Sequence, residues 1–199
     1  MKRSLDLLII IAAAPIVLPL LGLCALIIRV ALGSPVFFVQ TRAGLRGVPF
    51  RMIKFRSMLD TRDASGALLA DELRLTRVSR WLRATSLDEL PELWNVLRGE
   101  MTLVGPRPLL MEYLPRYSAE QARRGEVRPG VTGWAQINGR NATTWDTRLA
   151  LDVWYVDHQS TQLDLSILWT TIWRVLRRDG VRHGTHETMP LFLGSDRHE

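Results

Sequence analysis

The longest run of hydrophobic positions in the chain extends from Leu7 to Ile28 and contains no charged residue. As a helix, this run would reach about 33 Å, which is enough to cross a hydrocarbon core of ~30 Å. Pro15 and Pro19 lie inside it. Each proline removes a backbone donor and crowds the preceding turn, so a helix through them should kink or break. The pattern predicts a membrane helix with a break near its middle.

Basic residues flank this run on both sides, and they are Lys2, Arg3, Arg29, Arg42 and Arg46. Because Lys and Arg are enriched on the cytoplasmic side of membrane segments, we expect both ends of the run on that side. We therefore predict that residues 1–32 form a re-entrant helix, which enters the bilayer and returns to the same face. A straight span is the alternative. A cleaved secretory signal fits less well, because its apolar region is usually ~7–15 residues long.

The remaining residues, 33–199, are predicted to form one cytoplasmic domain with a less ordered tail after about residue 180. Apolar and basic side chains mix between Pro49 and Met58, after a glycine-containing turn, which predicts a β-hairpin of residues 36–39 and 49–58. Apolar spacing predicts helices over residues 71–84, 87–97, 109–117, 119–124, 147–158 and 163–178. The fold class is therefore α+β and mainly helical.

The predicted helix 163–178 combines a broad apolar sector, which includes Trp169 and Trp173, with arginines near its end. Tryptophan and arginine in this arrangement are typical of an amphipathic helix lying in the membrane interface. A core helix whose basic end complements its dipole is the alternative. Two acidic residues of the preceding helix, Asp152 and Asp157, either add to the candidate site or face solvent, and the solvent-facing interpretation is favoured.

The net charge is +6 and the calculated pI is about 10.4, which indicates an anionic partner. Next to an apolar membrane segment, an anionic lipid surface and a phosphorylated ligand are favoured over nucleic acid. Cys24 is the single cysteine and lies in the apolar run. This excludes a disulfide framework and a thiol-rich metal site, and it fits a reducing compartment.

The segment Ser86-Leu87-Asp88-Glu89 is the main candidate for chemistry. Taken alone, Ser-x-x-Glu is a capping box at a helix start. However, the neighbouring segments carry arginines that suit phosphate groups, namely Arg83, Arg107, Arg128 and Arg140. Arginine binds phosphate oxygens with its planar fork. Carboxylates tolerate a phosphate at the same site when Mg²⁺ bridges the two groups or when one carboxylate attacks phosphorus.

Together, five segments resemble the bacterial sugar transferase family, and specifically its small monotopic polyprenyl-phosphate phosphoglycosyl transferases. They are Phe50–Met58, Asp71–Arg74, Ser86–Leu90, Val104–Pro108 and Arg128–Gln136. The resemblance implies transfer of a sugar-1-phosphate from a UDP-sugar to undecaprenyl phosphate, with release of UMP. This would be the first membrane step of surface glycan assembly, at the bacterial inner membrane, with a catalytic domain facing the cytoplasm.

The resemblance also implies roles for single residues. Asp88 matches the nucleophile that forms a phosphosugar intermediate, and Glu89 matches its partner in Mg²⁺ binding or proton removal. Phosphate-binding roles fall on Arg83, Arg107 and Arg140. Lys54 is a further candidate for contact with a nucleotide phosphate or a lipid headgroup, with a solvated strand face as the alternative.

Two finer expectations follow from the resemblance. The break of the membrane helix matches Pro19, here preceded by Leu18 in place of serine, and Pro15 is a second candidate break. The segment Asn138–Ala142 fits a subgroup that uses N-acetylated amino sugars. Membrane lipids are expected partners, and a homodimer is compatible with the sequence.

A different class of function remains open at this stage. A membrane-anchored basic protein that binds anionic lipid or nucleic acid without catalysis would explain the charge and the anchor. It would leave Asp88 and Glu89 without a role. A metal pair of His183 and His186 is disfavoured, since the two residues lie in a tail with little pattern.

Overall fold

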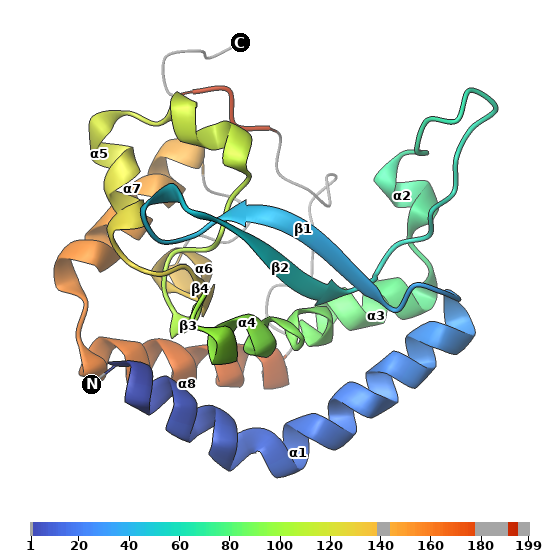
Figure 1. Ribbon diagram of the computed structural model, residues 1–199, viewed down its shortest axis with the longest axis horizontal. Coiled ribbons are helices and arrows are strands. Elements are labelled where there is room, and N and C mark those ends of the chain that lie inside the picture. Colours follow the sequence, from blue (N-terminus) through green and yellow to red (C-terminus); the bar gives the residue numbers. More distant parts are fainter. Residues whose placement is uncertain (1, 139–143, 178–190, 195–199) are drawn as a thin grey trace.

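The structure, a computed structural model, describes residues 2–138, 144–177 and 191–194. Helices dominate, together with two small sheets of two strands each (Figure 1). The α-helices are α1 Lys2–Ala31, α2 Asp71–Arg74, α3 Arg77–Ala84, α4 Glu92–Arg98, α5 Ala119–Ala122, α6 Trp134–Asn138, α7 Trp145–His158 and α8 Thr161–Arg177. The strands are β1 Phe37–Ala43, β2 Pro49–Phe55, β3 Thr102–Val104 and β4 Gly130–Thr132. Short 3₁₀ turns are η1 Leu45–Gly47, η2 Leu87–Glu89, η3 Met111–Arg116 and η4 Arg123–Glu126.

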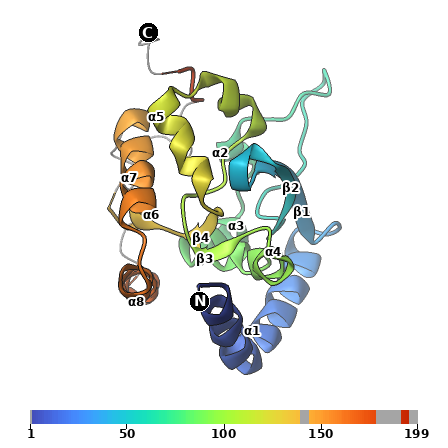
Figure 2. The same cartoon turned by 60° about the vertical axis from the view of Figure 1, so that its left-hand side comes forward.

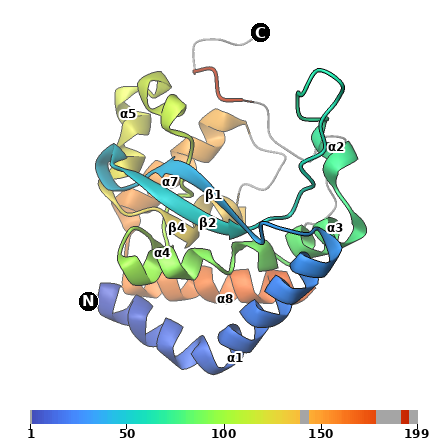
Figure 3. The ribbon, with the colours of Figure 1, turned by 45° about the vertical axis from the view of Figure 1, so that its right-hand side comes forward.

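Helix α1 continues through both prolines but bends midway, so that its two ends turn toward the rest of the protein (Figures 1 and 3). It is the one helix among the described residues that is long and apolar enough to cross a membrane, judged by length and composition. Its buried residues lie near its two ends: Asp6 and Ile10 in the first half, Cys24 and Ile28 in the second. The middle, including Ile16 and Leu18, is exposed. The predicted bend is present, although the helical hydrogen bonding is not interrupted into two separate helices.

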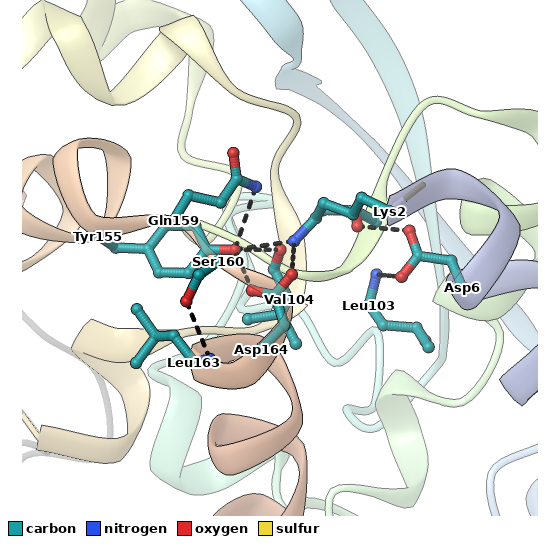
Figure 4. Close-up of polar contacts among 10 residues, drawn as sticks. Lys2, Asp6, Leu103, Val104, Tyr155, Gln159, Ser160, Leu163 and Asp164 are labelled. Atoms are coloured by element: carbon teal, nitrogen blue, oxygen red, sulfur yellow. Dashed lines mark hydrogen bonds and ion pairs between the residues drawn. The ribbon is translucent and has the colours of Figure 1, made fainter.

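The first turn of α1 is tied to the domain by polar contacts (Figure 4). Lys2 Nζ donates to Asp164 Oδ2 at 2.5 Å and to the Tyr155 hydroxyl at 2.8 Å. Asp6, which is buried, accepts a hydrogen bond from Thr102 Oγ1 at 2.6 Å. These contacts join the start of α1 to α7, α8 and β3.

The predicted hairpin is confirmed as an antiparallel pair in which Phe37 faces Phe55 and Ala43 faces Pro49. The second sheet, β3 with β4, is parallel and was not predicted. Its strands pair closely because their flanking glycines meet: a Cβ on Gly130 would lie 2.1 Å from the Gly105 amide nitrogen, and one on Gly133 would lie 2.1 Å from the Gly105 carbonyl oxygen. The Gly-Pro-Arg-Pro loop and the Arg-Pro-Gly loop therefore need glycine for backbone contact.

Four predicted helices are wrong in their extent or type. The expected helix 109–117 is the shorter 3₁₀ turn η3, and the expected helix 119–124 is α5 followed by the 3₁₀ turn η4. The expected helix 71–84 is split into α2 and α3, because Thr76 adopts an extended conformation and caps α3 by accepting from the Ser79 amide. The expected helix 87–97 is a 3₁₀ turn followed by α4, with Pro91 at the N-cap. Proline cannot donate the backbone hydrogen bond that a continuous helix would need there. The final helices, α7 and α8, are present as predicted with ends shifted by one or two residues.

Helix α8 buries one side and exposes the other. Ile167 is fully buried, whereas Trp169 is 70% exposed and Ile172 and Trp173 are also exposed. Figure 2 shows α8 and α1 at the same end of the molecule. The interpretation of α8 as an ordinary core helix therefore accounts for only one of its faces.

Candidate active site

Four segments bring the predicted site residues together. Asp88 and Glu89 lie on η2, which packs against β2 and α3. Strand β2 carries Lys54, and the loop after β3 carries Arg107. Arg83, in the last turn of α3, is close enough for its charge to lower the pKa of Asp88. Sequence positions more than 50 residues apart thus form one charged cluster.

The capping box expected at Ser86 is absent. Ser86 adopts a left-handed conformation with φ 55° and its side chain makes no capping hydrogen bond. A left-handed residue other than glycine carries backbone strain, which tends to be retained at functional positions. The turn at Ser86 leads directly into η2, which carries Asp88 and Glu89, and does not start a regular α-helix.

Glu89 is held by two cations. Its Oε1 lies 2.8 Å from Lys54 Nζ and is also bonded by Arg107 Nη2. Burial alone would raise the pKa of Glu89, but the charges of Arg107 and Lys54 outweigh it and hold the pKa well below its usual range. Glu89 is therefore ionised throughout the physiological range of pH.

Asp88 has a different environment. Its carboxylate forms no ion pair or hydrogen bond with any residue that the structure describes. Burial, and then the charge of Glu89, raise the pKa of Asp88 to about 6, and the cations of Lys54, Arg107 and Arg83 only partly oppose this. Adjacent carboxylates whose environments push their pKa values apart are suited to different roles.

A third carboxylate, Glu92, was missed by the sequence reasoning. It is 1% exposed and lies 3.0 Å from Lys54 Nζ, measured to Oε1. Burial, and then the charge of Glu89, raise its pKa to about 7. Its spacing of three from Glu89 and four from Asp88 was an available signal, because such positions share a side of a helix.

The remaining candidates fall outside this cluster. Arg128 donates instead to the Gly99 carbonyl at the end of α4, at 2.9 Å. Arg140, His183 and His186 lie outside the described residues. Asp157 is on the surface as interpreted, but Asp152 is buried and paired with Arg124, so its interpretation as solvent-facing is wrong.

The comparison with known families decides the classification. The family model described as bacterial sugar transferase matches residues 1–178. The chain belongs to the bacterial sugar transferase family. This confirms the resemblance inferred from the five segments and the expectation of a phosphoglycosyl transferase.

Three relatives place the chain within this family. The "Uncharacterized sugar transferase EpsL" of Bacillus subtilis (strain 168) is 57% identical over 169 residues, which cover 85% of this chain and 84% of the relative. The "UDP-glucose:undecaprenyl-phosphate glucose-1-phosphate transferase" of Caulobacter vibrioides is 42% identical, with coverages of 89% and 70%. The "UDP-N-acetylgalactosamine-undecaprenyl-phosphate N-acetylgalactosaminephosphotransferase" of Aeromonas hydrophila is 38% identical and is matched over 45% of its length, against 91% of this chain. The chain thus spans most of two of these sugar transferases and under half of the third.

The donor set of this sugar transferase fits a magnesium ion shared with a substrate. Within the described parts of the chain, no group of three or more His, Cys, Asp or Glu residues could hold a metal ion. Mg²⁺, however, commonly takes one or two protein carboxylates and completes its shell with water and substrate phosphates. Both ion pairs of Glu89 use Oε1, so Oε2 and the Asp88 carboxylate are the oxygens suited to such a shared site.

Proposed function

We propose that this enzyme transfers a sugar-1-phosphate from a UDP-sugar to undecaprenyl phosphate through a covalent intermediate on Asp88. The observation that carries the proposal is the contrast within the carboxylate pair. Glu89 is bound by Lys54 and Arg107, whereas Asp88 has no partner among the described residues. A carboxylate that is not paired with a lysine or an arginine keeps an oxygen lone pair for attack on phosphorus.

In the first step, a carboxylate oxygen of Asp88 attacks the β-phosphorus of the UDP-sugar. The bond between that phosphorus and the oxygen bridging to the α-phosphorus breaks, and UMP leaves with the bridging oxygen. The sugar phosphate stays on Asp88 as an acyl phosphate. Arg107 and Lys54 lie beside Glu89, where their charges can stabilise the phosphate oxygens during transfer.

In the second step, a phosphate oxygen of undecaprenyl phosphate attacks the same phosphorus. The bond to Asp88 breaks, which restores the carboxylate and leaves a diphosphate between sugar and lipid. A phosphate monoester has a second pKa of about 6, so most of the acceptor is a dianion at neutral pH and needs no base. The low pKa of Glu89 makes it a poor proton acceptor, and we assign it to organising cations.

Asp88 and Glu89 are the residues that would hold Mg²⁺ together with the donor diphosphate. The bound ion would supply positive charge between the carboxylates and the phosphate oxygens. Arg83 contributes a further positive charge near Asp88. Arg140 stays a prediction, because it lies outside the described residues.

The membrane placement that we propose is a re-entrant α1 in the bacterial inner membrane, with the catalytic domain on the cytoplasmic side. The bend of α1, its exposed middle and its tethered first turn support this (Figure 4). The exposed tryptophans of α8 support contact of that helix with the membrane interface. An active site at headgroup depth would meet the lipid phosphate without moving it out of the bilayer.

For the donor, we propose an N-acetylated amino sugar, on the basis of the segment Asn138–Ala142. The relatives do not separate the options, since their names include both a glucose and an N-acetylgalactosamine donor. A panel of UDP-sugars is therefore part of the test.

The deciding experiment measures UMP release in detergent or nanodiscs from each UDP-sugar, with undecaprenyl phosphate and Mg²⁺. We expect release by the wild type, none by Asp88→Asn, and loss on addition of EDTA. Asp157→Asn, a surface carboxylate on α7, is the matched control and should keep full activity. Incubation with a sugar-labelled donor alone should leave label on the wild-type protein and none on Asp88→Asn. UMP release by a folded Asp88→Asn variant would refute the nucleophile assignment.

A further inference from the structure

The protein contains a second, buried ion pair that the reaction scheme above does not use. Arg124 on η4 donates to Asp152 Oδ2 on α7 from Nε at 3.0 Å and from Nη2 at 2.7 Å. The two side chains are only 8% and 4% exposed. A buried ion pair contributes little net stability, because desolvation offsets the attraction between the charges. Its position therefore points to a geometric role.

Arg124 directly contacts the Gly-Pro-Arg-Pro loop, which carries Arg107. Its Nη2 also donates to the backbone carbonyl of Arg107 at 2.6 Å. Arg107 stands between Pro106 and Pro108, and proline restricts both itself and the residue before it. A hydrogen bond that fixes the Arg107 carbonyl thus limits the remaining freedom of this loop residue, and with it the path of the guanidinium toward Glu89.

The charge of Arg107 is attracted by Glu89 and also acts on two other arginines, Arg42 and Arg148. The pKa of Arg42 and the pKa of Arg148 are each lowered, first by burial and then by the charge of Arg107. The attraction of Glu89 acts only on the guanidinium tip, through Nη2. The contact from Arg124 acts on the backbone, so it sets where the side chain begins.

We propose that Arg124 and Asp152 are positioning residues, which hold the Arg107 backbone so that its guanidinium meets the reacting phosphate. The proposal rests on the proposed function and adds two residues to it. Asp152 fixes the direction of the Arg124 fork, and the fork bridges α7 and the Gly-Pro-Arg-Pro loop. Lysine at position 124 would keep the charge for Asp152, but its single ammonium cannot reproduce a planar fork that bonds both groups.

The chain offers a matched control next to this pair. Arg123 and Asp157 join the same two elements, η4 and α7, but their side chains are 34% and 42% exposed. Among the described residues, the hydrogen bonds and ion pairs of Arg123 go to Glu120, Glu126 and Asp157 and not to the Gly-Pro-Arg-Pro loop. Arg123→Lys therefore changes the same residue type, in the same link between elements, one position away. It should leave the activity unchanged.

The test measures kcat/KM for UMP release, with the UDP-sugar that the wild type uses fastest, and normalises it to the folded fraction from thermal melting. Misplacing a catalytic group by about 1 Å can cost roughly 100-fold, so we expect Arg124→Lys to lose about 10- to 100-fold. Asp152→Asn removes the same support from the other side and should lose activity to a similar degree. In an Arg107→Gln background, adding Arg124→Lys should change kcat/KM by no more than about twofold, because the effect acts through Arg107.

The outcomes are distinct. Wild-type activity in a folded Arg124→Lys or Asp152→Asn variant overturns the positioning role and leaves the proposed function intact. Equal losses in the wild-type and Arg107→Gln backgrounds also overturn it, since a general structural defect would be additive. No UMP release by the wild type with any donor would overturn both proposals.

Discussion

The ionisation of Asp88 should control the acid limb of the reaction. Only the carboxylate form can attack phosphorus, and kcat/KM reports the pKa values of the free enzyme. With a pKa of about 6, the carboxylate fraction is about 0.9 at pH 7 and about 0.09 at pH 5. We therefore expect kcat/KM for UMP release to fall about tenfold between these pH values. An aspartate at its ordinary pKa of about 3.9 would stay more than ~90% ionised at pH 5, and the rate would be nearly flat.

Removal of the Lys54 ammonium tests whether the pKa of Asp88 sets the pH at which kcat/KM falls. Among the groups that lower the pKa of Asp88, Lys54 has the largest effect, so Lys54→Met should move the acid limb to higher pH. Arg51→Met is the matched control, because Arg51 is an exposed arginine on the same strand, and it should leave the limb in place. A wild-type rate that does not fall by pH 5, or a limb in Lys54→Met at the wild-type position, would refute the electrostatic account of the site.

Three further predictions concern stability and topology. Burial raises the folded-state pKa of Glu92 from 4.5 to about 7, so the wild type loses stability as the pH rises through this interval. Glu92→Gln avoids this loss, so its melting temperature should exceed that of the wild type at pH 8. The gain in the free energy of unfolding should be up to about 3 kcal/mol at pH 8 and absent at pH 4.5. Equal differences at both pH values would contradict this. Gly130→Ala should lower the melting temperature strongly, because its Cβ would lie 2.1 Å from the Gly105 nitrogen, whereas Gly22→Ala has open space and should not. In cells, Ser4→Cys, at an exposed position of α1, should react with a membrane-impermeant maleimide only after the inner membrane is opened, and labelling of intact spheroplasts would exclude the re-entrant topology.

The elements that the sequence predicts well are those with a local signal. The bend of α1 follows from two prolines in an apolar run, and the hairpin follows from alternation around a turn. The parallel pairing of β3 with β4 has no local signal, because each strand has three residues and the contact depends on glycines 25 positions apart in the chain. The break at Thr76 was not predicted, because all the residues around it are compatible with a helix. The Thr76 side chain caps α3 and so ends the continuous helix that the pattern predicts.

The site divides in the same way. The grouping of Asp88 and Glu89 with Lys54 and Arg107 in one site could be anticipated from the resemblance of short motifs, which fix residue types at fixed places. The burial of Glu92 and of Asp152, which gives these two carboxyls their importance, could not be predicted. A carboxylate on a helix surface and one inside the protein look identical in a sequence, and only the fold separates Asp152, paired with Arg124, from the exposed Asp157.

The carboxylates of the site share the positive charge of Lys54 and Arg107 unequally. Three acidic groups, Asp88, Glu89 and Glu92, face the cations of Lys54 and Arg107. Burial, and then the charge of Glu89, hold the other two carboxyls with raised pKa values. A donor diphosphate that binds Arg107 and Lys54 would draw these cations partly away from Glu89, and Mg²⁺ would then balance the charge of the carboxylates. Donor and metal should therefore bind cooperatively: the affinity for Mg²⁺ should rise when a UDP-sugar is present, and this coupling should weaken in Lys54→Met, where one of the shared cations is missing.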